Sequence, residues 1–206
     1  MAPALEWELP GGTARAFPAD GGNILRPFIL AADGTGPTDL AAVEAGLGGT
    51  SYSFLDGLRA RGHDLVLVGY DKDVTELSRQ ARVLELAVLR AIAERRGFVP
   101  LVVGGIGRGA LTARYALAKM ERDRLDHQTR VYFSYNGTAP IPERESPGLE
   151  QLGNWPLRPR LLKLVSGDFK NTLSDDDFDD HYSGSPNTGT SLITKDLGSW
   201  LIDRTQ

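Results

Sequence analysis

Short apolar runs alternate with longer amphipathic segments through the middle of this chain. The apolar runs at 28–32, 65–68, 99–103 and 130–135 are bounded by turn residues and predict buried strands. The segments 51–61, 75–96 and 110–122 carry apolar residues at helical spacing and predict helices. Strands separated by helices are typical of βαβ units. We therefore predict an α/β fold with a mostly parallel sheet and helices on both faces.

The two ends of the chain are patterned differently from the middle. Strands are expected near 6–9 and 13–17, with Pro10-Gly11-Gly12 as the turn between them. After Pro140, the segments 149–155 and 157–165 are expected as short helices, 166–190 as polar turns and 191–202 as a terminal helix. No strand is predicted beyond Tyr135. The expected organisation is one domain over 1–206, with N-terminal strands in 1–26, a core in 27–140, and an irregular or helical part in 141–206 that leaves the sheet shortened.

The amino-acid composition limits the classes of partner and of chemistry that this chain can have. The 206 residues carry a net charge of -4, which argues against a nucleic-acid partner. The absence of cysteine excludes disulfides and thiolate chemistry. No segment is long and apolar enough for a membrane span, and the first residues lack the features of a signal peptide. A cytoplasmic location is expected, and no metal or cofactor is predicted.

Ligands of parallel sheets bind beyond the carboxyl ends of the strands. In this chain the loops at 33–37, 70–73, 104–109 and 136–140 follow predicted strands. These loops are therefore expected to form the functional edge of the sheet.

The most informative string is VVGGIGRGALTARYAL at 102–117, a buried strand, a glycine-rich turn and the start of a helix. It resembles the strand, elbow and helix of α/β-hydrolase esterases and lipases, in which G-x-S-x-G carries the nucleophile. The resemblance covers roughly 27–140. Alignment on Gly105 and Gly109 places Gly107 at the serine position, which removes the hydroxyl that forms an acyl-enzyme. A P-loop would need Gly-Lys-Ser/Thr here, and a dinucleotide fingerprint is only partly matched.

The resemblance also implies roles for neighbouring residues. Asp33, Gly34 and Thr35 resemble the family's oxyanion loop, where one backbone N–H acts with that of the residue after the nucleophile, Arg108. Asn136 follows the strand whose end would line the pocket, and it is a candidate catalytic residue. The Arg108 side chain either binds a substrate carboxylate or enolate oxygen or points to solvent. Asp33 and Asn136 have a second interpretation as ordinary turn residues.

The acid and the histidine of such a triad follow the nucleophile in the chain. His63 and His127 each precede a strand and are expected at the opposite edge. His181, at the end of the acidic run 174–181, is the remaining candidate acid or base. The same run is also compatible with a solvated acidic loop, and it lacks the spacing of an EF-hand calcium loop.

Three functions remain open from the sequence. The first is a non-hydrolytic enzyme, such as a cyclase, isomerase or lyase, that uses a pocket at the elbow 105–109. The second is an inactive binding or scaffold domain, and the third is a serine esterase whose nucleophile has been replaced by Gly107. A small ester or acyl compound is the expected ligand. A homo-oligomer or a partner protein is expected to cover the shortened sheet.

Overall fold

The computed structural model describes residues 5–49, 52–170 and 172–206. The elements in chain order are β1 (Leu5–Leu9), β2 (Gly12–Phe17), β3 (Pro27–Ala31), α1 (Leu40–Leu47), α2 (Phe54–Ala60), β4 (Asp64–Tyr70), α3 (Leu77–Glu94), β5 (Leu101–Ile106), α4 (Arg108–Arg122), β6 (Thr129–Tyr135), α5 (Ser146–Gln151), β7 (Arg160–Val165), a 3-10 turn η1 (Asp175–Asp177), β8 (Asp180–Ser183) and α6 (Lys195–Arg204).

The strands form one sheet in the order β1-β2-β4-β3-β5-β6-β7-β8. Strand β2 runs antiparallel to both β1 and β4, and every pair from β4 to β8 is parallel. The predicted α/β class and the mostly parallel sheet are confirmed. Strand β3 lies in the centre of the sheet, with β4 on one side and β5 on the other. Because β3 and β5 pair in parallel, their carboxyl ends are adjacent.

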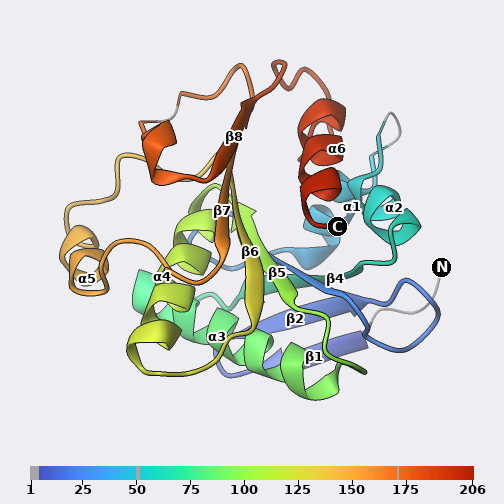
Figure 1. Ribbon diagram of the computed structural model, residues 1–206, viewed down its shortest axis with the longest axis horizontal. Coiled ribbons are helices and arrows are strands. Elements are labelled where there is room, and N and C mark those ends of the chain that lie inside the picture. The colour runs from blue at the N-terminus through green and yellow to red at the C-terminus, as the bar shows by residue number, and fades with distance from the viewer. Residues whose placement is uncertain (1–4, 50–51, 171) are drawn as a thin grey trace.

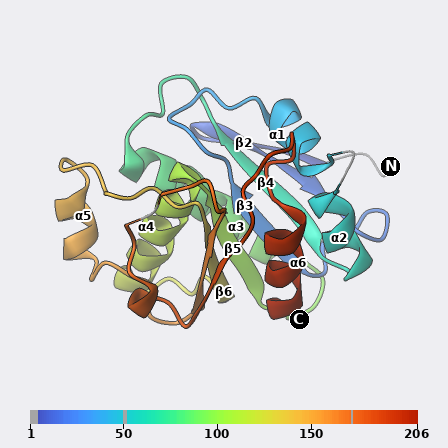
Figure 2. The same cartoon turned by 90° about the horizontal axis from the view of Figure 1, so that it is seen from above.

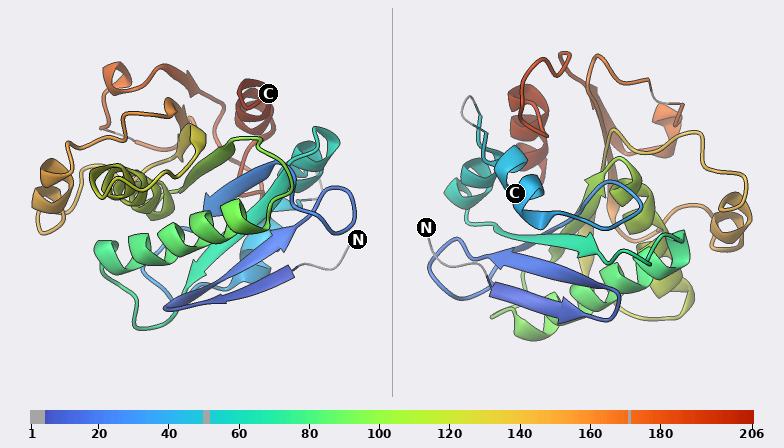
Figure 3. Two further views of the ribbon diagram at one scale, coloured as in Figure 1. Left: turned by 60° about the horizontal axis from the view of Figure 1, so that its bottom comes forward. Right: turned by 180° about the vertical axis from the view of Figure 1, so that it is seen from behind.

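Helices cover both faces of the sheet (Figure 1). Helices α3 and α4 pack on each other and on one face, and α1, α2 and α6 pack on the other. Figures 2 and 3 show the same two layers from above, from below and from behind. Each face therefore has its own apolar core, and both cores hold β5 and its elbow in place.

The C-terminal part differs from the expectation. No strand was expected beyond Tyr135, but β7 and β8 extend the sheet, so that prediction is wrong. Strand β7 lies where 157–165 was expected to be helical, because its leucines pair with β6 and pack into the cores on both faces. Helix α1 was not predicted, and Ser51, at the start of the expected helix 51–61, lies outside the described residues. The expected helix near 149–155 is present as α5, and the terminal helix is present as α6.

Candidate active site

The turn between β5 and α4 is a sharp strand-to-helix elbow at Gly107. Its backbone has φ 54° and ψ -120°, a conformation that strains any residue with a side chain. Strand and helix approach so closely that a Cβ on Gly105 would lie 2.3 Å from the carbonyl carbon of Gly109. The Gly107 N–H donates to the Tyr135 carbonyl at 2.9 Å, which ties the elbow to the end of β6. The glycines of the motif therefore permit this close approach.

The space beside Gly107 is occupied by Asp33, from the loop after β3. A Cβ on Gly107 would lie 2.3 Å from Asp33 Oδ1 and 2.6 Å from Asp33 Oδ2. The carboxylate thus lies where a nucleophile's side chain would begin. A serine at position 107 would require the Asp33 side chain to rotate away.

Asp33 Oδ1 accepts two backbone hydrogen bonds. The Arg108 N–H donates at 2.7 Å and the Gly34 N–H at 2.8 Å. These are the two N–H groups expected to form an oxyanion hole, one after the nucleophile and one from the loop after β3. The structure therefore brings together Asp33, Gly34, Gly107 and Arg108, and a carboxylate oxygen accepts from both of the N–H groups expected to form the hole. Thr35 lies exposed on the same loop.

The Arg108 side chain is buried between helices α3 and α5. Its two terminal nitrogens donate to the Glu145 carboxylate at 2.7 and 3.0 Å, and its Nε donates to Gln80 Oε1 at 2.8 Å. Gln80 in turn donates to the Gly34 carbonyl at 3.1 Å. The expectation that this side chain points to solvent is wrong, because the side chain is buried and paired with Glu145, whereas its role in binding a substrate oxygen stays a prediction.

Asn136 joins the ends of β6 and β7. Its side-chain amide donates to the Ser166 hydroxyl and accepts from the Ser166 N–H, each at 2.9 Å. Two residues further on, Asp168 Oδ1 accepts from the Asn187 N–H at 2.9 Å. Hydrogen bonds from the Asn187 backbone and the Ser166 side chain hold the pKa of Asp168 below its ordinary value. In chain order, Asp168 and Asn187 follow the elbow as an acid and a histidine would.

Solved esterase structures share this architecture. Est1E from Butyrivibrio proteoclasticus matches with a TM-score of 0.61 and 14% identity over 98% of this chain and 96% of that one. A hyperthermophilic esterase from Pyrobaculum calidifontis matches with 0.62 and 11% over 98% and 84%. A fungal esterase from Rhizomucor miehei matches with 0.58 and 11% over 99% and 82%. This chain has the α/β-hydrolase fold.

The likeness is one of fold. No model of a protein family and no curated protein sequence matches the chain. At 9–14% identity, the three-dimensional match shows a similar backbone fold and does not show that the chemistry of the site is similar. The residues at the α/β-hydrolase elbow of this chain must therefore be assessed from their own geometry.

The histidines lie away from the elbow. His63 is buried ahead of β4, and burial lowers its pKa to about 4. His127 is also buried; its Nε2 lies 3.0 Å from Glu121 Oε1. His181 lies within β8 opposite Lys163, half-exposed, and its Nε2 is 3.6 Å from Asp175 Oδ2. Its proposed role as acid or base at the elbow stays a prediction.

Two cavities are lined by residues named above. One of about 470 Å³ is lined by Thr75, Tyr115 and Glu145 among others, and one of about 600 Å³ is lined by Tyr52, Asn187 and Thr194 among others. Neither is lined by Gly107 or Asp33. In the described part of the chain no three His, Asp or Glu side chains are grouped to hold a metal ion, and no helix is long and apolar enough to cross a bilayer.

Gln80 and Glu145, which hold the Arg108 side chain, and Asp168 and Asn187, which follow the elbow in chain order, were not predicted from the sequence. Gln80 gave a weak signal, because it is a polar residue between Leu77 and Ala81 on the apolar face of α3. The other three lie in loops or at a short helix's end, and only the tertiary structure brings them to the site.

Proposed function

We propose that this α/β-hydrolase-fold chain descends from an ester hydrolase and now acts as a binding domain, with its catalytic elbow closed by its own Asp33. The observation that carries the proposal is the pair of N–H donors on Asp33 Oδ1, from Arg108 and Gly34. An oxyanion hole accelerates a reaction by stabilising negative charge that develops in the transition state. Here a resident carboxylate supplies that charge permanently.

The remaining catalytic positions support the same interpretation. Gly107 has no nucleophilic atom, and Asn187, whose backbone contacts Asp168, has no titratable side chain. The carboxylate of Asp33 lies where the side chain of a nucleophile would begin, so a substrate at the elbow would have to displace it. The binding-domain hypothesis is therefore favoured over a cyclase, isomerase or lyase.

Stepwise reconstruction of the site tests the proposal with a short-chain aryl ester as substrate. The unmodified chain and Gly107→Ser are expected to give no hydrolysis above buffer, because in both the hole holds Asp33 and no base is present. Gly107→Ser combined with Asp33→Ala and Asn187→His is expected to give measurable hydrolysis. The same triple variant with Asn187→Gln serves as the matched control and is expected to be inactive.

Each result has a distinct meaning. Turnover by the unmodified chain would overturn the proposal. Turnover by Gly107→Ser alone would instead support the hypothesis of an esterase whose nucleophile has been replaced, because Asp33 would then have rotated away unaided.

A second experiment tests the occupied hole without any reaction. Asp33→Ala leaves two N–H donors without their carboxylate, so added benzoate is expected to raise the Tm of this variant. The unmodified chain and the control Asp71→Ala, from the loop after β4, are expected to show no such rise. An equal response of all three proteins would mean that the carboxylate of Asp33 does not block the hole.

A further inference from the structure

The opposite edge of the sheet exposes large apolar side chains. Phe98 is 93% exposed and Leu157 88%, and Val99 and Leu125 are also exposed. They lie in the three loops that precede β5, β6 and β7, which are neighbouring strands. Exposed apolar residues scattered singly need no explanation, but a contiguous group of them is typical of an interaction surface.

Contacts between the loops make this group one surface. Phe98 shares a hollow of about 470 Å³ with Asp126 and Arg130, which belong to the loop before β6 and the start of β6. Asp126 forms an ion pair with Arg158 at 3.2 Å, and Arg158 follows Leu157. We call this group the amino-edge surface; it comprises Arg95, Arg96, Phe98, Val99, Arg124, Leu125, Arg130, Leu157 and Arg158.

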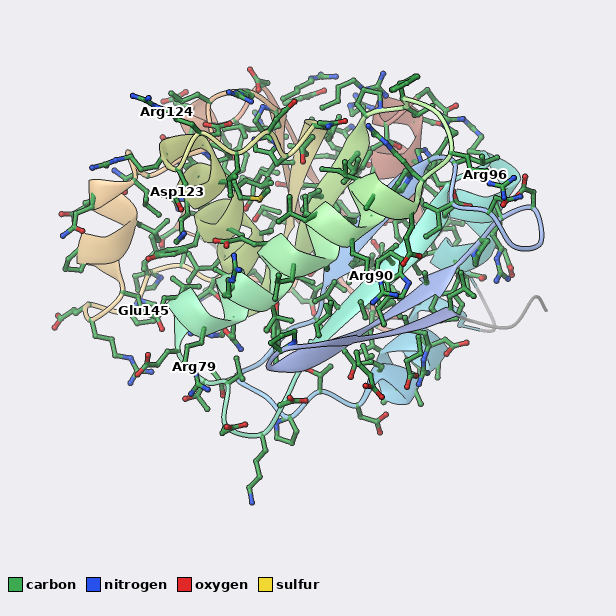
Figure 4. All side chains as sticks on the ribbon, turned by 90° about the horizontal axis from the view of Figure 1, so that it is seen from below. Arg79, Arg90, Arg96, Asp123, Arg124 and Glu145 are labelled. Atoms are coloured by element: carbon green, nitrogen blue, oxygen red, sulfur yellow. The ribbon has the colours of Figure 1, made fainter. Side chains whose placement is uncertain are left out.

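The same loops are strongly basic although the chain is acidic. The segments 95–100, 122–130 and 157–160 contain seven arginines and two aspartates, against a net charge of -4 for the whole chain. Arg96 and Arg124 are exposed beside the apolar residues. In Figure 4 Arg124 lies at the upper left beside Asp123 and Arg96 at the right-hand margin, whereas Arg79 and Glu145, near the carboxyl ends of the strands, lie at lower left. Arginine is thus concentrated in these loops, where Arg158 is paired with Asp126 and Arg160 with Asp180.

We infer that the amino-edge surface binds an anionic phospholipid bilayer, with Phe98 and Leu157 entering the boundary between headgroups and acyl chains. Apolar tips surrounded by arginines fit this boundary, because the tips leave water while the guanidinium groups remain among the phosphates. A nucleic acid would satisfy the arginines, but it would leave Leu157 and Val99 in water. The surface is separate from the elbow, so this inference does not depend on the site being closed.

Co-sedimentation with vesicles tests the inference on the full chain. We expect binding to vesicles of phosphatidylcholine mixed with phosphatidylglycerol, weak binding to phosphatidylcholine alone, and loss of binding at high salt. Arg96→Gln and Arg124→Gln should each weaken binding about fivefold. Phe98→Ser and Leu157→Ser should each weaken it about tenfold. The controls Arg144→Gln, at the carboxyl edge, and Leu5→Ser, on β1, should bind as the unmodified chain does.

A fluorescent probe separates insertion from adsorption. Because the chain has no cysteine, Phe98→Cys can carry a single polarity-sensitive dye, with Leu5→Cys as its matched control. A blue shift with anionic vesicles is expected at position 98 only. Equal shifts at both positions, equal binding to both vesicle types, or binding to duplex DNA without binding to vesicles would overturn the inference. A dimer in sedimentation velocity that is abolished by Phe98→Ser would overturn it in favour of a second copy of the chain.

Discussion

Both edges of this sheet contain arginines, but the surroundings of these arginines differ. At the carboxyl edge, Asp33 accepts from the backbone N–H groups of Gly34 and Arg108, the Arg108 side chain donates to Glu145, and the Asp33 carboxylate lies where the side chain of a nucleophile would begin. At the amino edge, Phe98 and Leu157 extend into solvent among arginines. Parallel sheets bind ligands at the carboxyl edge as a rule. In this chain the two N–H donors at the elbow have an internal acceptor, and exposed apolar side chains lie at the other end of the strands.

A buried arginine and an exposed arginine differ in how much their surroundings contribute to stability. Arg108 is 7% exposed and depends on Glu145 for its neutralisation, whereas Arg96 is exposed. A buried ion pair is costly to break because the remaining charge stays out of water, while an exposed charge is solvated with or without a partner. The comparison therefore predicts large losses of stability at the carboxyl edge and small ones at the amino edge.

The largest effect is expected from Glu145→Ala. The substitution leaves the Arg108 guanidinium buried with only the side chain of Gln80 and the carbonyl of Thr75, and it should lower the free energy of unfolding by about 3–5 kcal/mol. Urea denaturation measures the loss. Glu150→Ala on helix α5, which begins directly after Glu145, removes an exposed hydrogen bond with Ser146; it is the control and should change stability by less than about 0.5 kcal/mol. Equal losses in the two variants would contradict the assigned ion pair.

The next effect depends on pH and lies beneath the amino edge. His63 is buried and its pKa falls to about 4, because burial disfavours the imidazolium form. Its ordinary pKa in the unfolded chain is about 6.5, so the unfolded state binds the proton more readily and stability falls as the pH drops from about 6.5 to about 4. The contribution reaches up to about 3 kcal/mol at the acid end of that range.

Urea denaturation between these pH values checks the assignment. His63→Gln should reduce the slope of stability against pH. A slope that is the same in the unmodified chain and in His63→Gln would show that this histidine is not the group responsible.

The elbow itself should show a coupling between two residues. Gly107→Ala introduces a Cβ at φ 54° and within 2.3 Å of Asp33 Oδ1, and it should cost about 1–3 kcal/mol. In the Asp33→Gly background the collision is absent, so the same substitution should cost less and only the backbone strain should remain. A double-mutant cycle measures the difference. Identical costs in both backgrounds would mean that Asp33 does not occupy the space beside Gly107.

The central strands and the elbow were predictable from the sequence because their signals are local. The strands at 28–32, 65–68, 99–103 and 130–135 are continuous apolar runs, and the string at 102–117 carries strand, turn and helix together. The N-terminal hairpin was predictable from its Pro-Gly-Gly turn. Turn residues beside each of these elements mark where it begins and ends, so the elements can be recognised without knowledge of distant residues.

The C-terminal strands were not predictable in this way. Strand β7 contains Lys163 in its centre, and this lysine interrupts the apolar run. Its side chain is nevertheless buried, and its ammonium group donates to Asp175 at 2.8 Å, which compensates for the loss of water. Strand β8 has four residues, three of them exposed. The partners of Arg108 lie 28 and 37 residues away along the chain, so no periodicity indicates them. Contacts of this kind are fixed by the tertiary packing alone.

The smallest effect is expected at Phe98, and it bears most directly on the comparison of the edges. An aromatic ring that is 93% exposed contributes almost no burial to folding, so Phe98→Ser should change the free energy of unfolding by less than about 0.5 kcal/mol. Phe28→Ser, at a fully buried ring of β3, should cost at least about 3 kcal/mol by the same measurement. If Phe98→Ser proved as costly as Phe28→Ser, the ring would be part of the core, and the amino edge would be as closed as the elbow. If Phe98→Ser leaves the free energy of unfolding unchanged and abolishes vesicle binding, the ring contributes to binding and not to the stability of the fold. The two edges then differ in what their residues do.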